Sequence, residues 1–188
     1  MDKKSERARV LKERNALSTA KRGELNHALC SFLSDFLDSV KVQTIGAFLP
    51  IGSEPDISEV LKNWLRAGAA RQVFLPVTEG ITLRFAFWDP AKPLMIGRFS
   101  VPEPTSDLFS EPPLLLVPCV ALNKQGYRLG YGAGYYDRYL PRCRNAVALG
   151  VAFEAQRVPE AAADGRDRQL DGFVTERKVY RGTDEFEL

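Results

Sequence analysis

The sequence predicts an α/β fold in which a mostly parallel sheet carries helices on both of its faces. Two observations support this prediction. Short apolar runs, typical of strands that are buried on both faces, recur along the chain. Between them lie segments in which apolar residues return every three or four positions, the pattern of a helix that packs on a core. The 188 residues, 45% of them hydrophobic, suit one domain spanning residues 1–188.

The first forty residues are expected to form two helices. Segment 3–16 contains no proline and is rich in charged residues that favour helices. Segment 18–40 is amphipathic, with Leu29 and Leu33 among the apolar residues of one face. Ser18 separates the two helices as the expected N-cap, because its hydroxyl can accept a hydrogen bond from a backbone N–H of the first turn.

Strands are expected along the rest of the chain. Apolar runs predict four buried strands, at residues 44–49, 72–77, 114–119 and 146–153. Alternation predicts a half-buried strand at 81–88, with one face formed by Ile81, Leu83, Phe85 and Phe87. A helix is expected at 56–67, with Gly68 just past its end.

Three further segments complete the chain. Residues 90–113 are rich in proline and are expected to form a long ordered excursion. A glycine-rich loop covers 126–134 and is expected to lead into a helix at 135–140. Residues 173–174 and their neighbours are expected to add a last strand.

Composition excludes several functional classes. The net charge of +2, from 26 basic and 24 acidic residues, is too balanced for nucleic acid to be the main partner. The first 22 residues are charged and lack the apolar centre of a signal peptide, and no apolar run is long enough to span a membrane. We therefore expect a cytoplasmic monomer that acts on small molecules.

The cysteines predict neither a zinc site nor a redox motif. Cys30, Cys119 and Cys143 are far apart in the sequence and form no CxxC pair. Free thiols, buried or partly buried, are expected in a reducing compartment. A catalytic thiol would need a base, and the sequence has a single histidine, His27.

The most informative segment is GYRLGYGAGYYDRYL at 126–140. Its alternating glycines allow successive backbone N–H groups to point at one anion. Arg128 and Arg138 add guanidinium donors for phosphate, and Asp137 offers a hard oxygen for Mg²⁺. The segment is neither a P-loop nor a dinucleotide-binding fingerprint. The alternative is a glycine-rich turn before an aromatic helix that packs on the core, and Tyr139 is expected to pack in this way.

The position of this loop also favours a binding site. Ligands of open α/β sheets bind beyond the carboxyl ends of the strands. Loops 50–56 and 123–137 both leave predicted buried strands and both carry charged residues. We expect them to form two walls of one site.

Residues 117–140, which read VPCVALNKQGYRLGYGAGYYDRYL, resemble the motif of the 5-formyltetrahydrofolate cyclo-ligase family. The resemblance extends over essentially the whole chain. It implies a three-layer α/β/α fold of the NagB/RpiA/CoA-transferase-like type. It also implies an ATP-dependent cyclisation of 5-formyltetrahydrofolate, with ATP as co-substrate and Mg²⁺ as cofactor.

The resemblance assigns site residues by position. It implies catalytic roles for Arg128, Tyr135 and Asp137. It implies ATP contacts at Lys3, Lys4, Arg7, Arg128, Leu129, Gly130, Tyr131, Gly132, Ala133, Gly134, Tyr135 and Tyr136. It implies substrate contacts at Leu49, Glu54, Tyr131, Gly132, Gly134 and Tyr135. The implied metal ligands are Asp137 and Asp167.

Plainer explanations exist for the residues outside the glycine-rich loop. Lys3 and Arg7, one helical turn apart, are also typical of a solvated helix face. Asp56 alone would serve as a helix cap, and Glu54 would then merely favour the helix dipole. Asp167 is also typical of a charged surface turn.

Three departures from the family pattern leave the substrate open. Asn123 stands where the family usually has Asp, Arg166 replaces a usual His, and Pro55 and Ile57 alter the motif that follows the first strand. A paralog with another formylated substrate is one alternative. A non-catalytic nucleotide- or folate-binding protein is another, and a sugar-phosphate isomerase of the broader fold type is a third.

Overall fold

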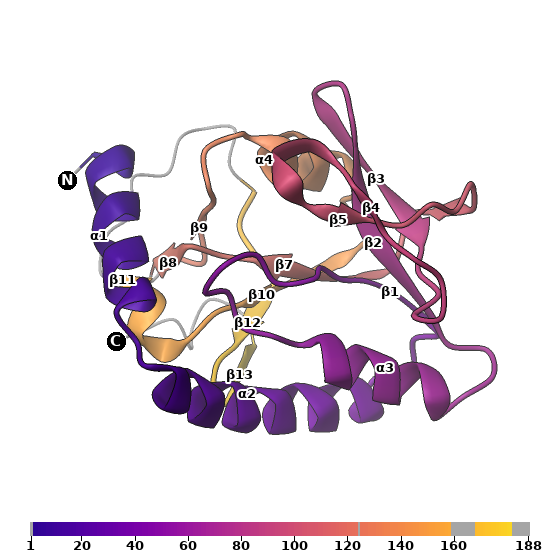
Figure 1. Ribbon diagram of the computed structural model, residues 1–188, viewed down its shortest axis with the longest axis horizontal. Helices are drawn as coiled ribbons and strands as arrows, with labels where there is room; N and C mark the ends of the chain where they lie inside the picture. The colour runs from indigo at the N-terminus through magenta and orange to yellow at the C-terminus, as the bar shows by residue number, and fades with distance from the viewer. Residues whose placement is uncertain (1, 124, 159–167, 182–188) are drawn as a thin grey trace.

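An eight-stranded sheet forms the middle layer of the computed structural model, which describes residues 2–123, 125–158 and 168–181 (Figure 1). In sheet order the strands are β13 (Val179–Arg181), β12 (Gly172–Val174), β10 (Val147–Val151), β7 (Leu114–Pro118), β1 (Thr44–Gly46), β2 (Gln72–Glu79), β3 (Thr82–Phe87) and β6 (Phe109–Ser110). The five strands from β12 to β2 pair in parallel, and β13, β3 and β6 add antiparallel edges. The predicted mostly parallel sheet is confirmed.

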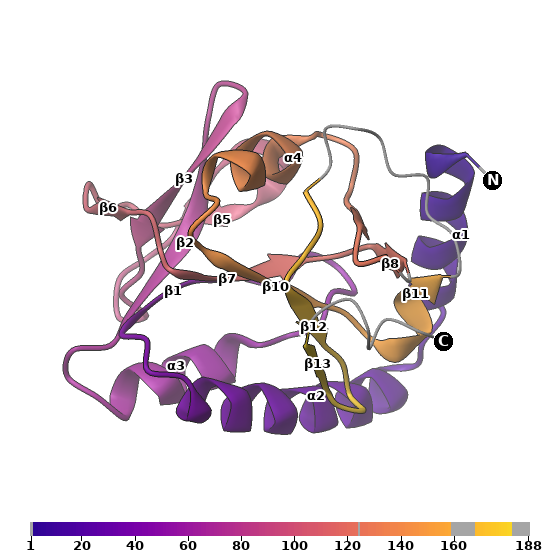
Figure 2. The same cartoon turned by 180° about the vertical axis from the view of Figure 1, so that it is seen from behind.

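Helices cover both faces of this sheet. Helices α2 (Thr19–Ser39) and α3 (Ser58–Arg66) run along one face (Figures 1 and 2). The short α4 (Tyr135–Tyr139) and the 3₁₀ turn η2 (Leu140–Arg142) lie on the other. Each face has its own apolar core, because central strands such as β7 bury side chains in both directions. Ser18 caps α2 as predicted, its hydroxyl accepting a hydrogen bond from the Lys21 backbone N–H at 3.1 Å.

Helix α1 (Lys3–Asn15) packs beside a second, smaller sheet that the sequence analysis missed (Figure 2). This sheet consists of β11 (Arg157–Val158), β8 (Ala121–Asn123) and β9 (Arg128–Leu129). Val10 of α1 is buried against Ala121 and Leu129 in a separate apolar cluster. The strands have only two or three residues each, too short for a periodic pattern to reveal them.

The expected half-buried strand at 81–88 is confirmed as β3, with one correction. Leu83 and Phe85 are buried, but Ile81 is 69% exposed because it precedes the strand, in the turn after Gly80. The excursion at 90–113 is ordered. It holds β4 (Met95–Ile96), the 3₁₀ turn η1 (Arg98–Ser100), β5 (Pro102–Glu103) and β6.

The three cysteines are free thiols, as expected. Burial raises the pKa of Cys119 to about 12 and that of Cys30 to about 11, so neither thiol is activated. Among the described helices, none combines the length and apolar character needed to cross a membrane.

Candidate functional site

A cavity of about 560 Å³ opens at the carboxyl ends of β1, β2 and β7, where the sequence analysis expected a site. Its lining comes from six separate stretches of chain. These residues are Phe48, Leu49, Ile51, Glu54, Pro76, Thr78, Leu83, Phe99, Val101, Pro102, Glu103, Pro118, Arg128, Gly130, Tyr131, Gly132, Ala133, Gly134, Tyr135, Tyr136 and Asp137. Loops 50–56 and 123–137 thus form two of its walls, as predicted.

The glycine-rich loop forms the longest continuous stretch of this lining. Every predicted residue from Gly130 to Asp137 faces the cavity, whereas Leu129 is buried in the cluster under α1. Gly132 and Gly134 have backbone φ angles of 101° and 73°, which residues with a Cβ atom rarely adopt. The loop is therefore held in a shape that brings its backbone close to a ligand in the cavity.

Arg128 and Asp137 form an ion pair in the cavity wall. Nη2 of Arg128 lies 2.5 Å from Oδ1 of Asp137, and the Arg128 side chain is only 5% exposed. No described residue accepts a hydrogen bond from the buried Nε of Arg128, and the guanidinium lies 5.1 Å from the Tyr136 ring centre. A buried cation with a donor still unsatisfied favours an anionic ligand at this point.

Helix α1 contacts the outer side of the same loop. Nε of Arg7 donates a 2.7 Å hydrogen bond to the carbonyl oxygen of Gly130. Lys3 is half-buried and Lys4 is exposed, one turn earlier on the helix. None of these three side chains lines the cavity itself. We call Lys3, Lys4 and Arg7 the cationic flank of the loop.

Glu54 is a buried carboxyl in the cavity wall formed by loop 50–56. Its Oε2 accepts a 2.8 Å hydrogen bond from the Ile51 backbone N–H, and its Oε1 is buried without a partner among the described residues. Burial raises the pKa of Glu54, and the Tyr131 hydroxyl and the Arg14 charge oppose that effect. Asp56 lies just before Ile57, the N-cap residue of α3, and accepts hydrogen bonds from the backbone and hydroxyl of Ser58. Glu54 is therefore available to a ligand.

The cavity lining outside the glycine-rich loop is largely apolar. Of its apolar residues, only Leu49 was predicted from the sequence. Phe48, Ile51, Leu83, Phe99 and Val101 also line the cavity. They come from the segment that follows β1, from β3 and from the 90–113 excursion. No local pattern could group them, because tertiary packing brings these segments together.

Tyr135 joins three segments at the mouth of the cavity. Its hydroxyl donates to the carbonyl oxygen of Gly80 at 3.1 Å and accepts from Nη1 of Arg98 at 3.2 Å. The Phe99 ring meets the Tyr135 ring edge-on at 6.2 Å between centres. Phe99 and Ser100 have φ angles of 58° and 60°, an uncommon backbone shape that places this aromatic wall.

Two polar residues near the cavity were missed. Arg14 is buried and contacts both Ser53 and Tyr131. Arg14 follows Arg7 by seven residues, so both lie on the same face of α1. This spacing could have predicted Arg14 as a residue near the site. Glu103 is also buried, and its Oε1 accepts hydrogen bonds from the backbone and hydroxyl of Thr78 at 3.0 and 2.8 Å.

Asn123, which departs from the family pattern, has a structural role. Its Oδ1 accepts hydrogen bonds from the backbone N–H groups of Gln125 and Tyr127 at 3.0 and 2.8 Å. An amide oxygen accepts such bonds as a carboxylate does. The substitution therefore preserves the turn that leads into the glycine-rich loop.

The described residues contain no group of three or more potential metal ligands. Asp137 is the predicted ligand within them, and Asp167 and Arg166 lie outside the described residues. Mg²⁺ that accompanies a nucleotide commonly uses only one or two protein carboxylates, with phosphate and water oxygens supplying the rest. The donor set at Asp137 fits that mode.

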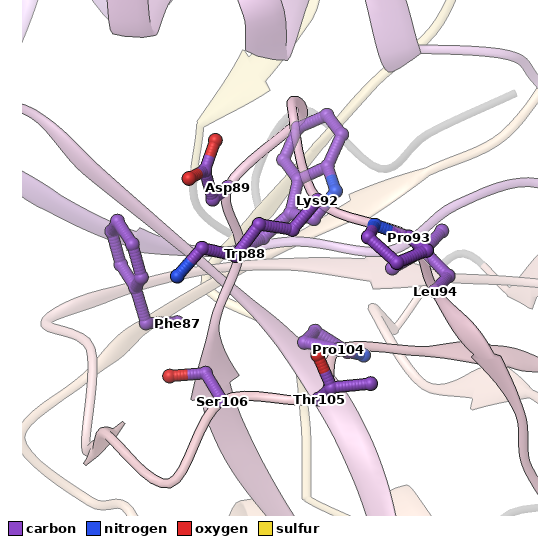
Figure 3. A pocket seen from close by; sticks show the side chains of 9 residues that line it. All are labelled: Phe87, Trp88, Asp89, Lys92, Pro93, Leu94, Pro104, Thr105 and Ser106. Atoms are coloured by element: carbon purple, nitrogen blue, oxygen red, sulfur yellow. The ribbon is translucent and has the colours of Figure 1, made fainter.

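A second pocket is too small for such ligands. Its volume is about 20 Å³, between Trp88 and Lys92 on one side and Pro104 to Ser106 on the other (Figure 3). Such a space holds about one water molecule. The larger cavity is therefore the candidate site.

Comparison with known proteins points to one family. A model described as the 5-formyltetrahydrofolate cyclo-ligase family matches residues 1–176. A 5-formyltetrahydrofolate cyclo-ligase from Mycoplasma pneumoniae is 31% identical over 179 residues, covering 94% of this chain and 99% of that protein. A protein of the same name from Escherichia coli (strain K12) is 28% identical over 181 residues, covering 91% and 98%.

Solved structures agree. The 5,10-methenyltetrahydrofolate synthetase of Aquifex aeolicus superposes with a TM-score of 0.84 at 31% identity, covering 96% of this chain and 93% of the other. A 5,10-methenyltetrahydrofolate synthetase of Mycoplasma pneumoniae gives a TM-score of 0.78 at 28% identity, covering 94% and 99%.

Proposed function

Because the chain belongs to the 5-formyltetrahydrofolate cyclo-ligase family, we propose that it catalyses the ATP-dependent cyclisation of 5-formyltetrahydrofolate to 5,10-methenyltetrahydrofolate. ADP and phosphate are the other products. One observation carries the proposal: a single cavity joins a glycine-rich loop with a buried arginine to an apolar wall with a buried carboxyl. These are the complements of a triphosphate and of a reduced pterin.

The apolar wall suits the folate. Flat rings of a pterin and an aminobenzoyl group bury well against Leu49, Phe99 and Tyr135. Oε1 of Glu54, to which none of the described residues donates, is an acceptor for the amino and ring N–H groups of the pterin. A buried acceptor discriminates strongly, because a ligand without the matching donors leaves it unsatisfied.

The glycine-rich loop suits the triphosphate. Its residues and Arg128 line the cavity, where backbone N–H groups and the guanidinium would neutralise phosphate charge. Arg7, Lys3 and Lys4 add positive charge along the flank of the loop, the nearest being Arg7 at Gly130. These residues would draw the nucleotide to the loop and orient its γ-phosphate toward the folate.

The chemistry then proceeds by displacement at phosphorus and carbon. The formyl oxygen attacks the γ-phosphate, ADP leaves, and the formyl carbon becomes an electrophilic iminium carbon bearing a phosphate ester. N10 attacks that carbon and loses its proton to solvent, and phosphate leaves, which closes the five-membered ring. Such a sequence depends on positioning and charge neutralisation more than on a protein nucleophile. Arg128 would stabilise charge on the transferred phosphoryl group, and Tyr135 would hold the folate against the loop.

We propose that Mg²⁺ binds with the nucleotide. Asp137 would hold it together with the triphosphate oxygens, and Asp167 is proposed as a second ligand. When bound, the ion supplies charge neutralisation of the triphosphate. We also propose that the protein acts as a monomer, since one chain supplies the cavity lining described above, and that it works in the cytoplasm.

An absorbance assay tests the proposal. Methenyltetrahydrofolate formation from 5-formyltetrahydrofolate is followed with Mg·ATP, without ATP, and with an ATP analogue that cannot transfer its γ-phosphate. Product is expected only with Mg·ATP, with one ADP released per product molecule. A folded protein that binds ATP but forms no product would favour a paralog with another formylated substrate, or a binding protein. A protein that binds no nucleotide would favour an isomerase.

A further inference from the structure

Arg14 is a buried cation outside the assigned binding residues, and it contacts two walls of the cavity. Its Nη2 donates to the Tyr131 hydroxyl at 2.6 Å, and its Nε donates to Oγ of Ser53 at 2.9 Å. The residue is 4% exposed, and its Nη1 is buried without a partner among the described residues. Tyr131 belongs to the glycine-rich loop, whereas Ser53 directly precedes Glu54.

The surroundings show that Arg14 is more than a packing residue. Ser53 also donates to Oδ1 of Asn15 at 2.5 Å, so the end of α1 is fastened twice to the loop after β1. The described carboxylates form no ion pair with Arg14, and Glu54 is the acidic group whose ionisation its charge assists. A buried arginine without a directly bonded carboxylate is costly, so its position needs a compensating role.

The ionisable groups around Glu54 come from four elements. Arg14 comes from α1, Arg128 and Tyr131 from the glycine-rich loop, Tyr136 from α4 and Cys119 from just after β7. Burial raises the pKa of Tyr131 to about 12 and that of Cys119 to about 12, so both stay neutral near pH 7. Among the described residues, the Ile51 backbone N–H, the Tyr131 hydroxyl and the charge of Arg14 oppose the effect of burial on the pKa of Glu54.

We propose that Arg14 is a positioning residue that ties the folate wall to the glycine-rich loop and places its positive charge near the Glu54 carboxyl for substrate binding. The inference rests on the proposed folate-binding role of Glu54. Through Tyr131, the same guanidinium holds the loop that is proposed to bind the triphosphate. Docking of α1 on the body of the protein thus makes both subsites competent together.

The test compares Arg14→Gln and Arg14→Lys with Arg9→Gln, a control on an exposed position of α1. The side chain of Arg9 is 42% exposed and pairs with Glu6 and Glu13. For each variant, KM for 5-formyltetrahydrofolate and for ATP is measured across a pH series. The Glu54 carboxyl is also titrated directly by ¹³C NMR in labelled protein without ligands.

Arg14→Gln is expected to raise the folate KM at neutral pH by about tenfold. The pH at which the folate KM is half-way through its acidic change should rise by about one unit. Loss of the positive charge raises the pKa of Glu54, so the carboxyl stays protonated to higher pH. Arg14→Lys keeps the charge and is expected to keep the midpoint while the folate KM rises, because the two-sided guanidinium contact is lost. Arg9→Gln should change neither quantity.

A folded Arg14→Gln protein with wild-type midpoints in both measurements would overturn the proposal. So would an equal response of Arg14→Gln and Arg9→Gln. Should Arg14→Gln fail to fold, Tyr131→Phe replaces it, since loss of the hydroxyl beside Glu54 must also raise the NMR midpoint. Absence of turnover in the unmodified protein would reject the proposed function instead, and the NMR titration would still decide whether Arg14 controls Glu54.

Discussion

Nη2 of Arg128 lies 2.5 Å from Oδ1 of Asp137, so the proposed phosphate-binding cation and the proposed metal ligand share one ion pair. Asp137 is partly exposed, while the Arg128 side chain is almost fully buried. The pair therefore orients Arg128 before any ligand binds, and it places a carboxylate beside the anion that Arg128 would hold. A metal ion that enters with the triphosphate would bind at Asp137, next to the phosphate that Arg128 would hold.

Asp137→Asn tests that arrangement. The amide keeps an oxygen for Arg128 but loses the charge that a metal ion needs. We expect the Mg²⁺ concentration for half-maximal rate to rise by at least about tenfold, the smallest effect typical of losing even an indirect metal partner. The protein should stay folded, but its melting temperature should fall, because the buried Arg128 loses its carboxylate partner. Asp107→Asn, at an exposed position outside the cavity lining, is the control, and equal kinetics for both variants would reject Asp137 as a ligand.

Arg7→Ala tests the cationic flank. Its loss removes a 2.7 Å hydrogen bond to Gly130 and a charge beside the proposed phosphates. We expect KM for ATP to rise roughly tenfold, the effect of losing about 1.5 kcal/mol, and KM for folate to change much less. Lys3→Ala should show a weaker form of the same bias. Equal changes in both constants would mean that α1 contributes stability alone.

Glu54→Gln tests the cost of the buried carboxyl through the pH dependence of stability. Burial raises the pKa of Glu54 in the folded protein. Stability from this group is therefore present below its unfolded pKa and is lost as pH rises through the folded pKa. We expect Glu54→Gln to unfold at a higher temperature than wild type near neutral pH, with the difference shrinking in acid, while folate affinity is lost.

Thermal unfolding across a pH series measures this difference. Glu59→Gln is the matched control, since the Glu59 side chain is 71% exposed on α3. A wild-type curve that runs parallel to the Glu54→Gln curve at every pH would contradict the predicted titration. Unchanged folate affinity would remove Glu54 from the proposed site.

Gly97→Ala tests the wall formed by the 90–113 excursion. A Cβ at Gly97 would lie 2.1 Å from Cδ of Glu103, which is buried and bonded to Thr78. We expect a loss of about 2 kcal/mol in the free energy of unfolding, in the range typical of overpacking.

Gly23→Ala is the control for this substitution. Gly23 lies inside α2, and a Cβ there meets nothing within 4 Å. We expect a gain of about 0.8–1.0 kcal/mol from helix propensity. Urea unfolding measures the free energy of unfolding of both variants. If Gly97→Ala leaves that free energy unchanged, the segment around Gly97 can shift away from Glu103 without cost.

Several elements of the fold were predictable because their signals are local. Residues 114–118 form a central strand buried on both faces, so an unbroken apolar run marks them. Ser18 could be recognised as an N-cap because capping depends on the residues of one turn. Ile81 was misplaced because alternation shows which residues share a face, but does not show where the strand begins.

The candidate site divides in the same way. The sequence by itself determined the parallel α/β sheet, the glycine-rich loop with Arg128 and Asp137, and the family, since each depends on neighbours along the chain. The role of Asp167 stays a prediction. Only the tertiary structure decided that Arg14 joins Glu54 and Tyr131 and that Phe99 closes the apolar wall. Residues distant in sequence are brought into contact by the burial of both sheet faces, and no local pattern encodes which side chains then meet in the remaining cavity.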